Sequence, residues 1–565
     1  MISGKKSYGK QKMGRKWLWS IPILGLLVAA APLREDYFEI SKQLEIMTAM
    51  FRELNIYYVD EIQPGELMET GMDAMVQSLD PYTVYYPESR VEDLRFMTTG
   101  EYGGIGASIQ YIHHQHLIVD VLPDFPASKA GLKIGDEITY VDGESVKGID
   151  PDLVSEMLQG ASGTDLTIRY IPVGSQSEST LTLTREKIKL PAVPYKEVIG
   201  DSTGYVVFSA FTRGSSFELR QAIRFLRDSV GINQLVLDLR GNGGGLLQES
   251  ISIVNLFVEK GEEVVSTKGK KEEWLKSYTT LADPLLPDLP VAVLIDEQSA
   301  SASEIVAGTL QDLDRAIIVG QESFGKGLVQ QTKPLAYGTK MKVTVAKYYT
   351  ASGRCIQRLD YGGERTQDGS AKAFADSTLK VFYTRNGRPV IDGKGVQPDA
   401  PVEVPYMSYV SEALFVNGII FDFANEWSAK HDTIGPAKEF ELTDDDWNDF
   451  VDFVENHDST EIVSRTRAMW DQLTTVAQEE QFYEVDSVAF QSFQNILNPS
   501  IESELNRFKE EIIWALEEEI VMRYYLQTGV IAWSIPKDET LKKATALLSS
   551  GQYEQILAGT ISESE

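Results

Sequence analysis

Residues 291–327 read VAVLIDEQSASASEIVAGTLQDLDRAIIVGQESFGKG and decide the fold class of the central part of the chain. The apolar run Val291–Ile295 predicts a buried strand, Ala302–Leu313 predicts a helix, and Ala316–Val319 predicts a second strand. Between about 187 and 400, strand patterns and helix patterns continue to alternate in this way. The alternation indicates an α/β core with parallel central strands.

Three short segments of this core have the composition of a catalytic site. Asp238–Gly245 follows a buried strand and is rich in glycine, so its amides can approach an anion or an oxyanion closely. Ser299–Glu304 places three serines at a strand-to-helix turn, where the helix dipole stabilises negative charge. A plain tight turn and a helix N-cap would use these residues equally well, and spacing does not say which serine is special.

The third segment, Gly320–Gly327, satisfies the pattern G-x-x-x-x-G-K that begins a phosphate-binding loop. That motif needs Ser or Thr next, to hold magnesium, and here Gly327 occupies the position. A helix should also follow, yet Lys333-Pro334 comes soon after. These departures argue against nucleotide binding and leave Lys326 to be explained.

The distribution of histidine limits the bases that could serve a serine nucleophile. The chain has five histidines, and none lies between His116 and His431. A Ser-His-Asp triad within the α/β core is therefore excluded, and a lysine made neutral by desolvation remains. Lys326, between two glycines and behind Phe324, suits that role.

The same segments resemble the C-terminal processing peptidases, or tail-specific proteases, which are envelope serine peptidases with a PDZ domain and a Ser-Lys dyad. The family patterns S-A-S-A-S-E-I-V-A-G, R-A-x-x-V-G and T-F-G-K-G-x-V-Q are matched in order at 299–308, 315–320 and 323–330, with Ser323 in place of the threonine. The family's D-L-R-x-N-P-G-G matches 238–245, with Gly243 in place of proline, which we expect to loosen the turn.

The resemblance implies a role for each matching residue. Ser301 falls on the family's nucleophile, Lys326 on its base, and Gln330 on the glutamine that orients the lysine. Oxyanion donation falls on Gly244 and on the amide of Ala302. The resemblance implies no metal and no cofactor.

Residues 96–186 form a small β-rich module that resembles a PDZ domain. In that family a loop of backbone amides holds the C-terminal carboxylate of a peptide, which adds as a strand beside about 108–110. The matching loop residues are Gly104, Ile105, Gly106 and Ala107. Three histidines follow this loop, but no acidic or histidine partner is evident, so we expect an exposed strand or turn and no metal site.

The N-terminus has the pattern of an export signal. The first 16 residues carry six basic residues and no acid, and an uncharged run follows from Trp17 to Leu33. We expect residues 1–33 to be a signal peptide or a retained membrane anchor at 17–33. The rest of the chain should then lie outside the cytoplasm, in the periplasm or cell envelope.

Charge and cysteine content exclude several partners. The net charge of −31 repels nucleic acid and acidic lipids, and the single cysteine excludes an intramolecular disulfide. Residues 401–565 hold 32 acidic and 10 basic residues and have helical apolar spacing. We expect this region to be a helical scaffold or a homo-oligomerisation domain, and an appendage without partners is the alternative.

These patterns together predict a multidomain α+β protein. Its expected parts are a helical N-terminal region (34–95), an inserted PDZ domain (96–186), an α/β Ser-Lys peptidase core (187–400) and an acidic helical C-terminal region (401–565). The expected function is an exported serine endopeptidase that recognises proteins or peptides with free, apolar C-termini. A catalytically inactive PDZ adaptor and an ATPase are the alternatives, and the intact Ser-Lys-Gln set argues against the adaptor.

Overall fold

The structure is a computed structural model and describes residues 1, 4, 20–404, 406–456, 465–483, 485–497 and 500–561. For residues 20–36, 93, 465 and 495 it describes the backbone alone. The side chains of the apolar run at 17–33 lie outside the described residues, so the export signal stays a prediction. Among the helices of the described residues, none is both long enough and apolar enough to cross a membrane.

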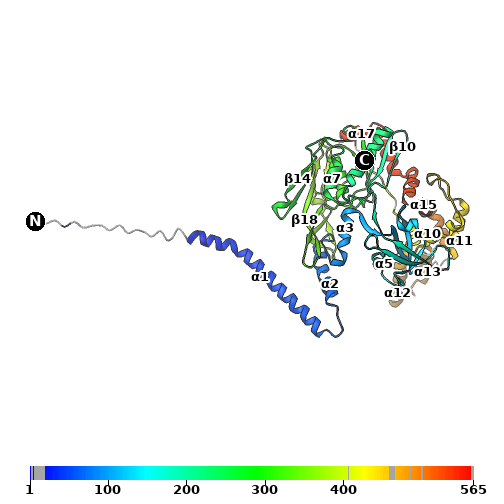
Figure 1. Cartoon of the computed structure of the whole chain (residues 1–565), viewed down its shortest axis with the longest axis horizontal. Helices are drawn as coiled ribbons and strands as arrows, with labels where there is room; N and C mark the ends of the chain where they lie inside the picture. The colour runs from blue at the N-terminus through cyan, green and yellow to red at the C-terminus, as the bar shows by residue number, and fades with distance from the viewer. Residues whose placement is uncertain are drawn as a thin grey trace. The chain divides into compact units, whose positions relative to one another are not determined.

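The chain divides into a unit of residues 1–81 and a unit of residues 82–565. The described part of the first unit contains α1 (Ser20–Tyr57) and α2 (Pro64–Gln77). Pro64 begins α2 at a position where the missing amide hydrogen of proline breaks no hydrogen bond. These helices, blue in Figure 1, confirm the helical N-terminal segment that the sequence predicts.

A sheet of six strands forms the centre of the second unit. Its four pairs from β11 to β23 are parallel, and β10 is antiparallel at one edge. In order across the sheet the strands are β10 (Tyr195–Ile199), β11 (Thr203–Val207), β12 (Gln234–Asp238), β15 (Val291–Ile295), β16 (Ile317–Gly320) and β23 (Ala400–Pro401). The predicted α/β core with parallel central strands is confirmed.

Each face of this sheet has its own helical layer, because successive strand residues point to opposite faces. Leu237 and Val293 pack on one face, and Val236 and Leu294 pack on the other. The first face is covered by α6 (Ser215–Arg224), α7 (Leu247–Val254) and α8 (Ala302–Asp312). The second is covered by α16 (Glu539–Ser549) and α17 (Gln552–Leu557). Helix α16 contacts β12, β15 and β16, and α17 contacts β16.

The second helical layer comes from the far C-terminal end of the chain. Apolar side chains of α16 and α17 share one buried cluster with the central sheet. The predicted boundary at residue 400 therefore separates these two helices from the core on which they pack. The C-terminal region therefore has two parts. Helices α16 and α17 complete the α/β core, and the preceding helices pack in a cluster of their own.

A second, antiparallel sheet lies beside α8. Its order is β1, β18, β13 and β14, and β17 also pairs with β18. The strands are β1 (Val84–Tyr86), β13 (Glu263–Gly269), β14 (Lys276–Thr279), β17 (Leu328–Pro334) and β18 (Lys340–Thr350). Because β17 begins two residues after Lys326, this sheet positions the lysine.

The PDZ module is a sheet with a helix packed on it. Its ordered strands are β3 (Ala107–Ile112), β4 (Gln115–Val121), β5 (Glu137–Val141), β7 (Asp165–Ile171) and β8 (Ser179–Thr184), and its helix is α5 (Pro151–Leu158). The short strands β2 (Glu101–Gly104) and β9 (Glu186–Lys189) pair where the chain enters and leaves the module. This arrangement agrees with the PDZ domain expected from the sequence.

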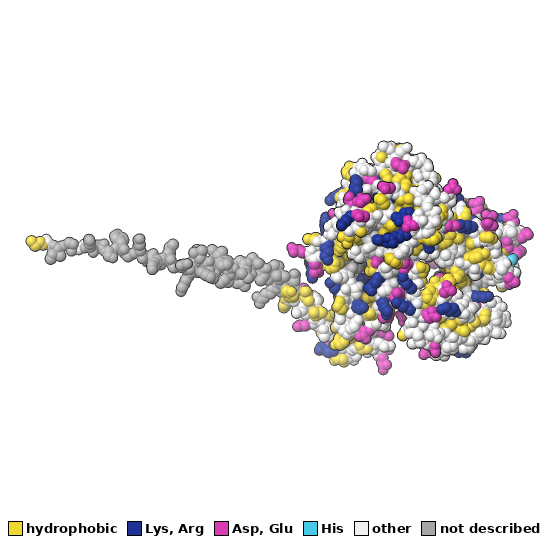
Figure 2. Space-filling model, turned by 45° about the horizontal axis from the view of Figure 1, so that its top comes forward, with side chains coloured by type: hydrophobic (Ala, Val, Ile, Leu, Met, Phe, Trp, Pro, Cys, Tyr) yellow, Lys and Arg dark blue, Asp and Glu magenta, His cyan; other side chains and the backbone are white. Residues whose placement is uncertain are grey.

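The remaining C-terminal helices form a core of their own beside the PDZ domain. Buried side chains are shared by α9 (Tyr409–Val416), α10 (Ile419–Lys430), α11 (Asp444–Asn456) and α15 (Lys509–Ser534). Phe421 of α10 packs against Leu117 and Ile134 of the PDZ domain. A carboxylate oxygen of Asp422 lies 2.9 Å from His113 Nε2. Acidic side chains are dense on the right flank in Figure 2, where Figure 1 shows α11.

Candidate active site

Two loops at the carboxyl ends of neighbouring parallel strands form the site. The serine loop (296–301) joins β15 to α8, and the lysine loop (321–327) joins β16 to β17. Parallel strands end at the same edge of a sheet, so residues far apart in the chain meet there. A strand follows Lys326, and the helix required by a phosphate-binding loop is absent at this position.

The three serines of the Ser299–Glu304 segment have different surroundings. Ser299 and Ser303 are fully buried, and their hydroxyls donate to the carbonyls of Leu239 (2.9 Å) and Asn242 (2.8 Å). Ser301 is partly exposed and is the N-cap of α8. Its backbone has φ 55° and ψ −109°, a region that non-glycine residues rarely adopt. Ser301 is thus the serine of the three that solvent and substrate can reach.

A buried carboxylate joins the serine loop to the lysine loop. Oε2 of Glu304 accepts hydrogen bonds from the amides of Ser301 (2.8 Å) and Lys326 (2.9 Å). Its Oε1 accepts from the hydroxyl of Ser323 (2.6 Å) and the amide of Gly325 (2.7 Å). Burial raises the pKa of Glu304, and these four hydrogen bonds oppose that rise. Glu304 therefore fixes both loops relative to each other.

Sequence reasoning did not assign Glu304 a role in the site. The spacing Ser301-x-x-Glu304 is that of a capping box, and this signal could have identified the local bond to the Ser301 amide. The contacts with the lysine loop depend on how the two strands are placed in the sheet. No local pattern reports those contacts.

Tyr348 makes a second connection between the two loops. It lies on β18, is 1% exposed, and its hydroxyl lies 3.0 Å from the Ser301 carbonyl and 2.8 Å from the Lys326 carbonyl. Burial, and then the nearby charge of Glu304, raise the pKa of Tyr348 well above its usual value. The phenol therefore stays protonated and able to donate. Sequence analysis assigned no role in the site to this residue either.

Gly244 lies directly against the serine loop. A Cβ atom at Gly244 would be 2.9 Å from Ser301 Cβ, 2.8 Å from the Ala302 nitrogen and 2.6 Å from the Ala300 carbonyl oxygen. Its φ of +98° is a further reason for glycine at this position. The structure thus brings Gly244, Ser301 and Ala302 together, as the resemblance implies.

The two amides expected to donate to an oxyanion differ in the hydrogen bonds that they already make. Ala302 is the first residue of α8, so its amide has no carbonyl partner within the helix. The Gly244 amide donates to Asn242 Oδ1 at 2.9 Å. The amide of Gly244 must therefore turn away from Asn242, or be shared with it, before it can bind another acceptor.

Lys326 of the predicted site lies at the end of the lysine loop, and Gln330 lies in β17, the strand that follows this loop. Lys326 Nζ is 4.2 Å from the centroid of the Tyr82 ring. Gln330 lies at a bulge in β17, and its Nε2 donates to Thr344 Oγ1 at 3.3 Å. The role of Gln330 in orienting Lys326 stays a prediction.

Residues 104–107, the loop expected to bind a peptide carboxylate, are called the carboxylate loop. The PDZ domain has a cavity of about 1160 Å³ between this loop and α5. Its lining includes Gly104, Ile105, Ala107, Leu158 and, from α3 (Val91–Thr99), Arg95 and Phe96. Gly106 does not line the cavity; its φ is +76° and a Cβ there would lie 2.6 Å from Phe125 Cβ. The cavity is large enough, and its lining apolar enough, to hold an apolar side chain beside an added peptide strand.

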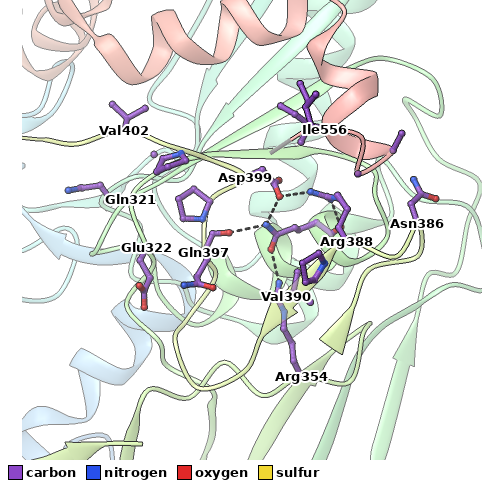
Figure 3. A pocket seen from close by; sticks show the side chains of 18 of the residues that line it. Gln321, Glu322, Arg354, Asn386, Arg388, Val390, Gln397, Asp399, Val402 and Ile556 are labelled. Atoms are coloured by element: carbon purple, nitrogen blue, oxygen red, sulfur yellow. Dashed lines mark hydrogen bonds and ion pairs between the residues drawn. The ribbon is translucent and has the colours of Figure 1, made fainter. Parts of the chain in front are cut away.

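A second cavity, of about 1520 Å³, lies between the lysine loop and the end of the described chain (Figure 3). At its base Arg388 pairs with Asp399, and Gln311 Nε2 donates to Asp399 Oδ1 at 2.9 Å. The other oxygen of Asp399 accepts from the amide of Ile318 in β16 at 2.8 Å. These groups satisfy one another, so we interpret them as a brace for β16, the strand that leads into the lysine loop. Among the described residues, no group of three or more His, Cys, Asp or Glu side chains could hold a metal.

Comparison with known proteins agrees with this architecture. Residues 202–363 match peptidase family S41, residues 117–171 match a PDZ domain, and residues 410–548 match the family described as "Probable PDZ-protease, C-terminal helical domain". Among solved structures, the photosystem II D1 C-terminal processing protease is 28% identical, with a TM-score of 0.35 over 64% of this chain and 93% of that chain.

Two curated relatives are similar over most of their own length. The carboxy-terminal-processing protease of Bartonella bacilliformis is 37% identical over 321 residues, 56% of this chain and 73% of the relative. A probable CtpA-like serine protease of Staphylococcus haemolyticus is 30% identical over 424 residues, 72% of this chain and 77% of the relative. These matches confirm the family resemblance drawn from the sequence. The chain therefore belongs to peptidase family S41, as a C-terminal processing serine protease with a PDZ domain.

Proposed function

We propose that this protease is an exported endopeptidase in which Ser301 is the nucleophile and neutral Lys326 is the general base. The observation that carries the catalytic part is the carboxylate of Glu304. One of its oxygens accepts hydrogen bonds from the amides of both residues, at 2.8 and 2.9 Å. A serine and a lysine whose backbones share one buried acceptor can form a catalytic pair when no histidine is near.

In the first half of the reaction, Ser301 Oγ attacks the carbonyl carbon of the scissile peptide bond and gives its proton to Lys326 Nζ. The carbon–nitrogen bond then breaks as Lys326 returns the proton to the leaving amine. In the second half, a water molecule gives a proton to Lys326 and attacks the resulting ester. The ester bond breaks, Ser301 recovers its proton, and the new C-terminus leaves.

The negative charge on the attacked oxygen would be held by the amides of Ala302 and Gly244. The Ala302 amide lies at the N-terminus of α8, where the helix dipole adds to the attraction. The Gly244 amide would exchange Asn242 Oδ1 for the oxyanion as charge develops. This exchange favours the transition state over the ground state, because a charged acceptor binds an amide more strongly than a neutral one.

Lys326 can accept a proton only in its neutral form, and desolvation is the factor that favours this form. The residue is partly buried. A substrate bound over the site would remove further water. The side-chain oxygen of Gln330 is the group we assign to hold the lysine amine, since its Nε2 already donates to Thr344.

The PDZ domain would select substrates by their free C-termini. A carboxylate would bind the amides of the carboxylate loop, and the terminal residues would pair with β3 in the neighbouring groove. Apolar lining such as Ile105 and Leu158 favours an apolar terminal side chain. Binding of matched acid and amide peptides to the full chain tests this: we expect amidation to weaken binding, and equal affinities would contradict carboxylate recognition.

Export rests on the basic segment and the uncharged run at the N-terminus. The test is protease accessibility of the chain in intact cells and in cells whose outer barrier has been opened. We expect digestion only when the barrier is open or absent. A chain digested only after the inner membrane is lysed would contradict export.

Variants of the two proposed catalytic residues test the reaction itself. Ser301→Ala and Lys326→Ala should each lower kcat/KM by about 10³-fold or more, because members of one catalytic unit fail together. Both should also lose labelling by a fluorophosphonate, which reacts with activated serines. Lys333→Ala, in the neighbouring strand β17, is the matched control and should keep both signals. Normal turnover by either catalytic variant would overturn the assignment.

A further inference from the structure

An aromatic ring outside the predicted site lies against the proposed base. Lys326 Nζ is 4.2 Å from the centroid of the Tyr82 ring, within the range of a cation–π contact. Tyr82 in turn meets Tyr361 edge to face, with ring centroids 5.9 Å apart and the two hydroxyls 3.4 Å apart. The lysine side chain therefore has an aromatic partner on a separate part of the chain.

The chain around Tyr82 is tied to the sheet that carries the site. Thr83 is 2% exposed, and its hydroxyl accepts a hydrogen bond from the amide of Thr344 at 3.3 Å. The next residue, Val84, pairs with Lys342 of β18. Thr344 also accepts the hydrogen bond from Gln330. One threonine thus connects the Tyr82 segment with the glutamine of the proposed site, so the position of the ring is fixed by the same strand.

An aromatic face distinguishes the two protonation states of a lysine. The electron-rich face attracts a positive charge, so it stabilises the ammonium and does little for the neutral amine. Charged and titratable groups also face the lysine loop from other elements. Among the described residues they include Glu304 from α8, Tyr348 from β18, and Arg358, whose amide donates to the Gly325 carbonyl at 2.9 Å and whose side chain pairs with Glu322. Removing the Tyr82 ring changes none of these groups.

We propose that Tyr82 is a positioning residue for Lys326, holding its ammonium in the resting enzyme and setting the pH at which the base becomes available. This inference rests on the proposed function, in which neutral Lys326 accepts the proton of Ser301. During catalysis the amine must lose its proton and leave the ring for the serine. The ring thus opposes activation until the substrate covers the site and removes water from the lysine.

The test compares Tyr82→Leu, which removes the ring, with Tyr82→Phe, which keeps it. The measurement is the pH profile of kcat/KM, supported by the pH profile of fluorophosphonate labelling. A lost cation–π contact should move the midpoint of the rising limb by about 0.5 to 1 pH unit to lower pH in Tyr82→Leu. Tyr82→Phe should keep the wild-type midpoint. Tyr82→Met serves as a second ring-free variant if the leucine variant does not fold. An unchanged midpoint in a folded ring-free variant would overturn the proposal.

A second readout separates this proposal from the catalytic assignment. In a Ser301→Ala background, the reactivity of Lys326 toward an amine-selective reagent can be followed against pH by mass spectrometry. We expect the Lys326 midpoint to fall in Tyr82→Leu, while Lys333, 5.7 Å from the Trp274 ring, keeps its own midpoint. If Lys326 is not the base, activity will survive Lys326→Ala but this titration will still shift. If the titration does not shift, the role of Tyr82 is wrong whatever the identity of the base.

Discussion

The two helical layers of the central sheet are held to it by different interactions. On the catalytic face, every residue of α8 is buried, and Glu304 near its start accepts four hydrogen bonds. Such bonds depend steeply on distance and angle. They therefore fix the position of the serine loop relative to the lysine loop.

On the opposite face, α16 and α17 are held mainly by apolar burial. Leu541, Leu547 and Ile556 are 1–2% exposed and pack on the sheet. A few polar links add to this burial. Arg240 bonds both Asp238 at the end of β12 and Asp538, the N-cap of α16. Gln234 of β12 donates to Ser549 Oγ of α16 at 3.1 Å, and the Tyr553 hydroxyl of α17 donates to the Arg315 carbonyl at 3.0 Å. Apolar packing is not directional, so this face contributes stability and the catalytic face contributes geometry. The comparison predicts that the two faces respond differently to substitution.

The largest effect should come from placing a charge in the apolar layer. Leu547→Asp would bury a carboxylate with no partner against the sheet, which costs several kcal/mol, about 4 kcal/mol or more. The sheet carries both catalytic loops, so we expect loss of the folded core and of fluorophosphonate labelling together. The measurements are thermal unfolding followed by circular dichroism, and labelling of the soluble fraction.

The matched control is Leu473→Asp in α12 (Arg465–Glu479), where the leucine is 52% exposed. We expect its free energy of unfolding to stay within about 0.5 kcal/mol of the wild type. This pair of variants also tests the expectation that the C-terminal region is a scaffold apart from catalysis. A Leu547→Asp protein that remains folded and labelled would support that expectation and contradict the shared core.

The catalytic face could be predicted from the sequence further than the apolar face could. Three ordered motifs and the absence of histidine identified Ser301 and Lys326 as candidates. Tyr348 could not be found in this way, because its partners are 22 and 47 residues away and meet it only in the folded sheet. The apolar spacing of α16 predicts an amphipathic helix, but it carries no information about which surface the helix covers. That surface is the central sheet.

A smaller and more local effect is expected from two neighbouring glycines. Gly244→Ala places a Cβ atom 2.6 to 2.9 Å from the serine loop and forces a side chain into a left-handed conformation. We expect kcat to fall by about 10²- to 10³-fold, the cost of losing one oxyanion donor. Gly243→Ala has nothing within 4 Å of its Cβ and should keep activity near the wild type. Steady-state kinetics on one peptide substrate compares the two.

The two glycine variants test whether close contacts on the α8 face fix the position of the proposed catalytic residues. Gly244→Ala should also lower the free energy of unfolding, because its Cβ clashes with backbone atoms and its φ is +98°, whereas Gly243→Ala should unfold like the wild type. The fall in kcat should persist at temperatures where Gly244→Ala is still fully folded; a fall that only follows unfolding would make the loop a folding element alone. If Gly243→Ala loses as much activity as Gly244→Ala, close approach to the serine loop is not the reason for the glycine.

The smallest expected effect concerns the C-terminal helical core, whose buried cluster is separate from the clusters on the two faces of the central sheet. Burial, and then Glu504, raise the pKa of Tyr409 to about 12, and its hydroxyl donates to Glu504 Oε2 at 2.5 Å. In the unfolded chain this tyrosine titrates near pH 10. The raised value stabilises the folded state below pH 10, and this contribution is lost as the pH rises from about 10 to about 12.

Because the side chain is only partly buried, we expect this contribution to the free energy of unfolding to be at most about 1 kcal/mol. Urea unfolding of Tyr409→Phe and its parent, both with Ser301→Ala to prevent self-cleavage, should differ at pH 8, should differ by about half as much at pH 11, and should converge by about pH 12. Other tyrosines titrate alike in both proteins and cancel in the comparison. A difference that stays constant with pH would mean that the bond to Glu504 does not hold the proton of Tyr409.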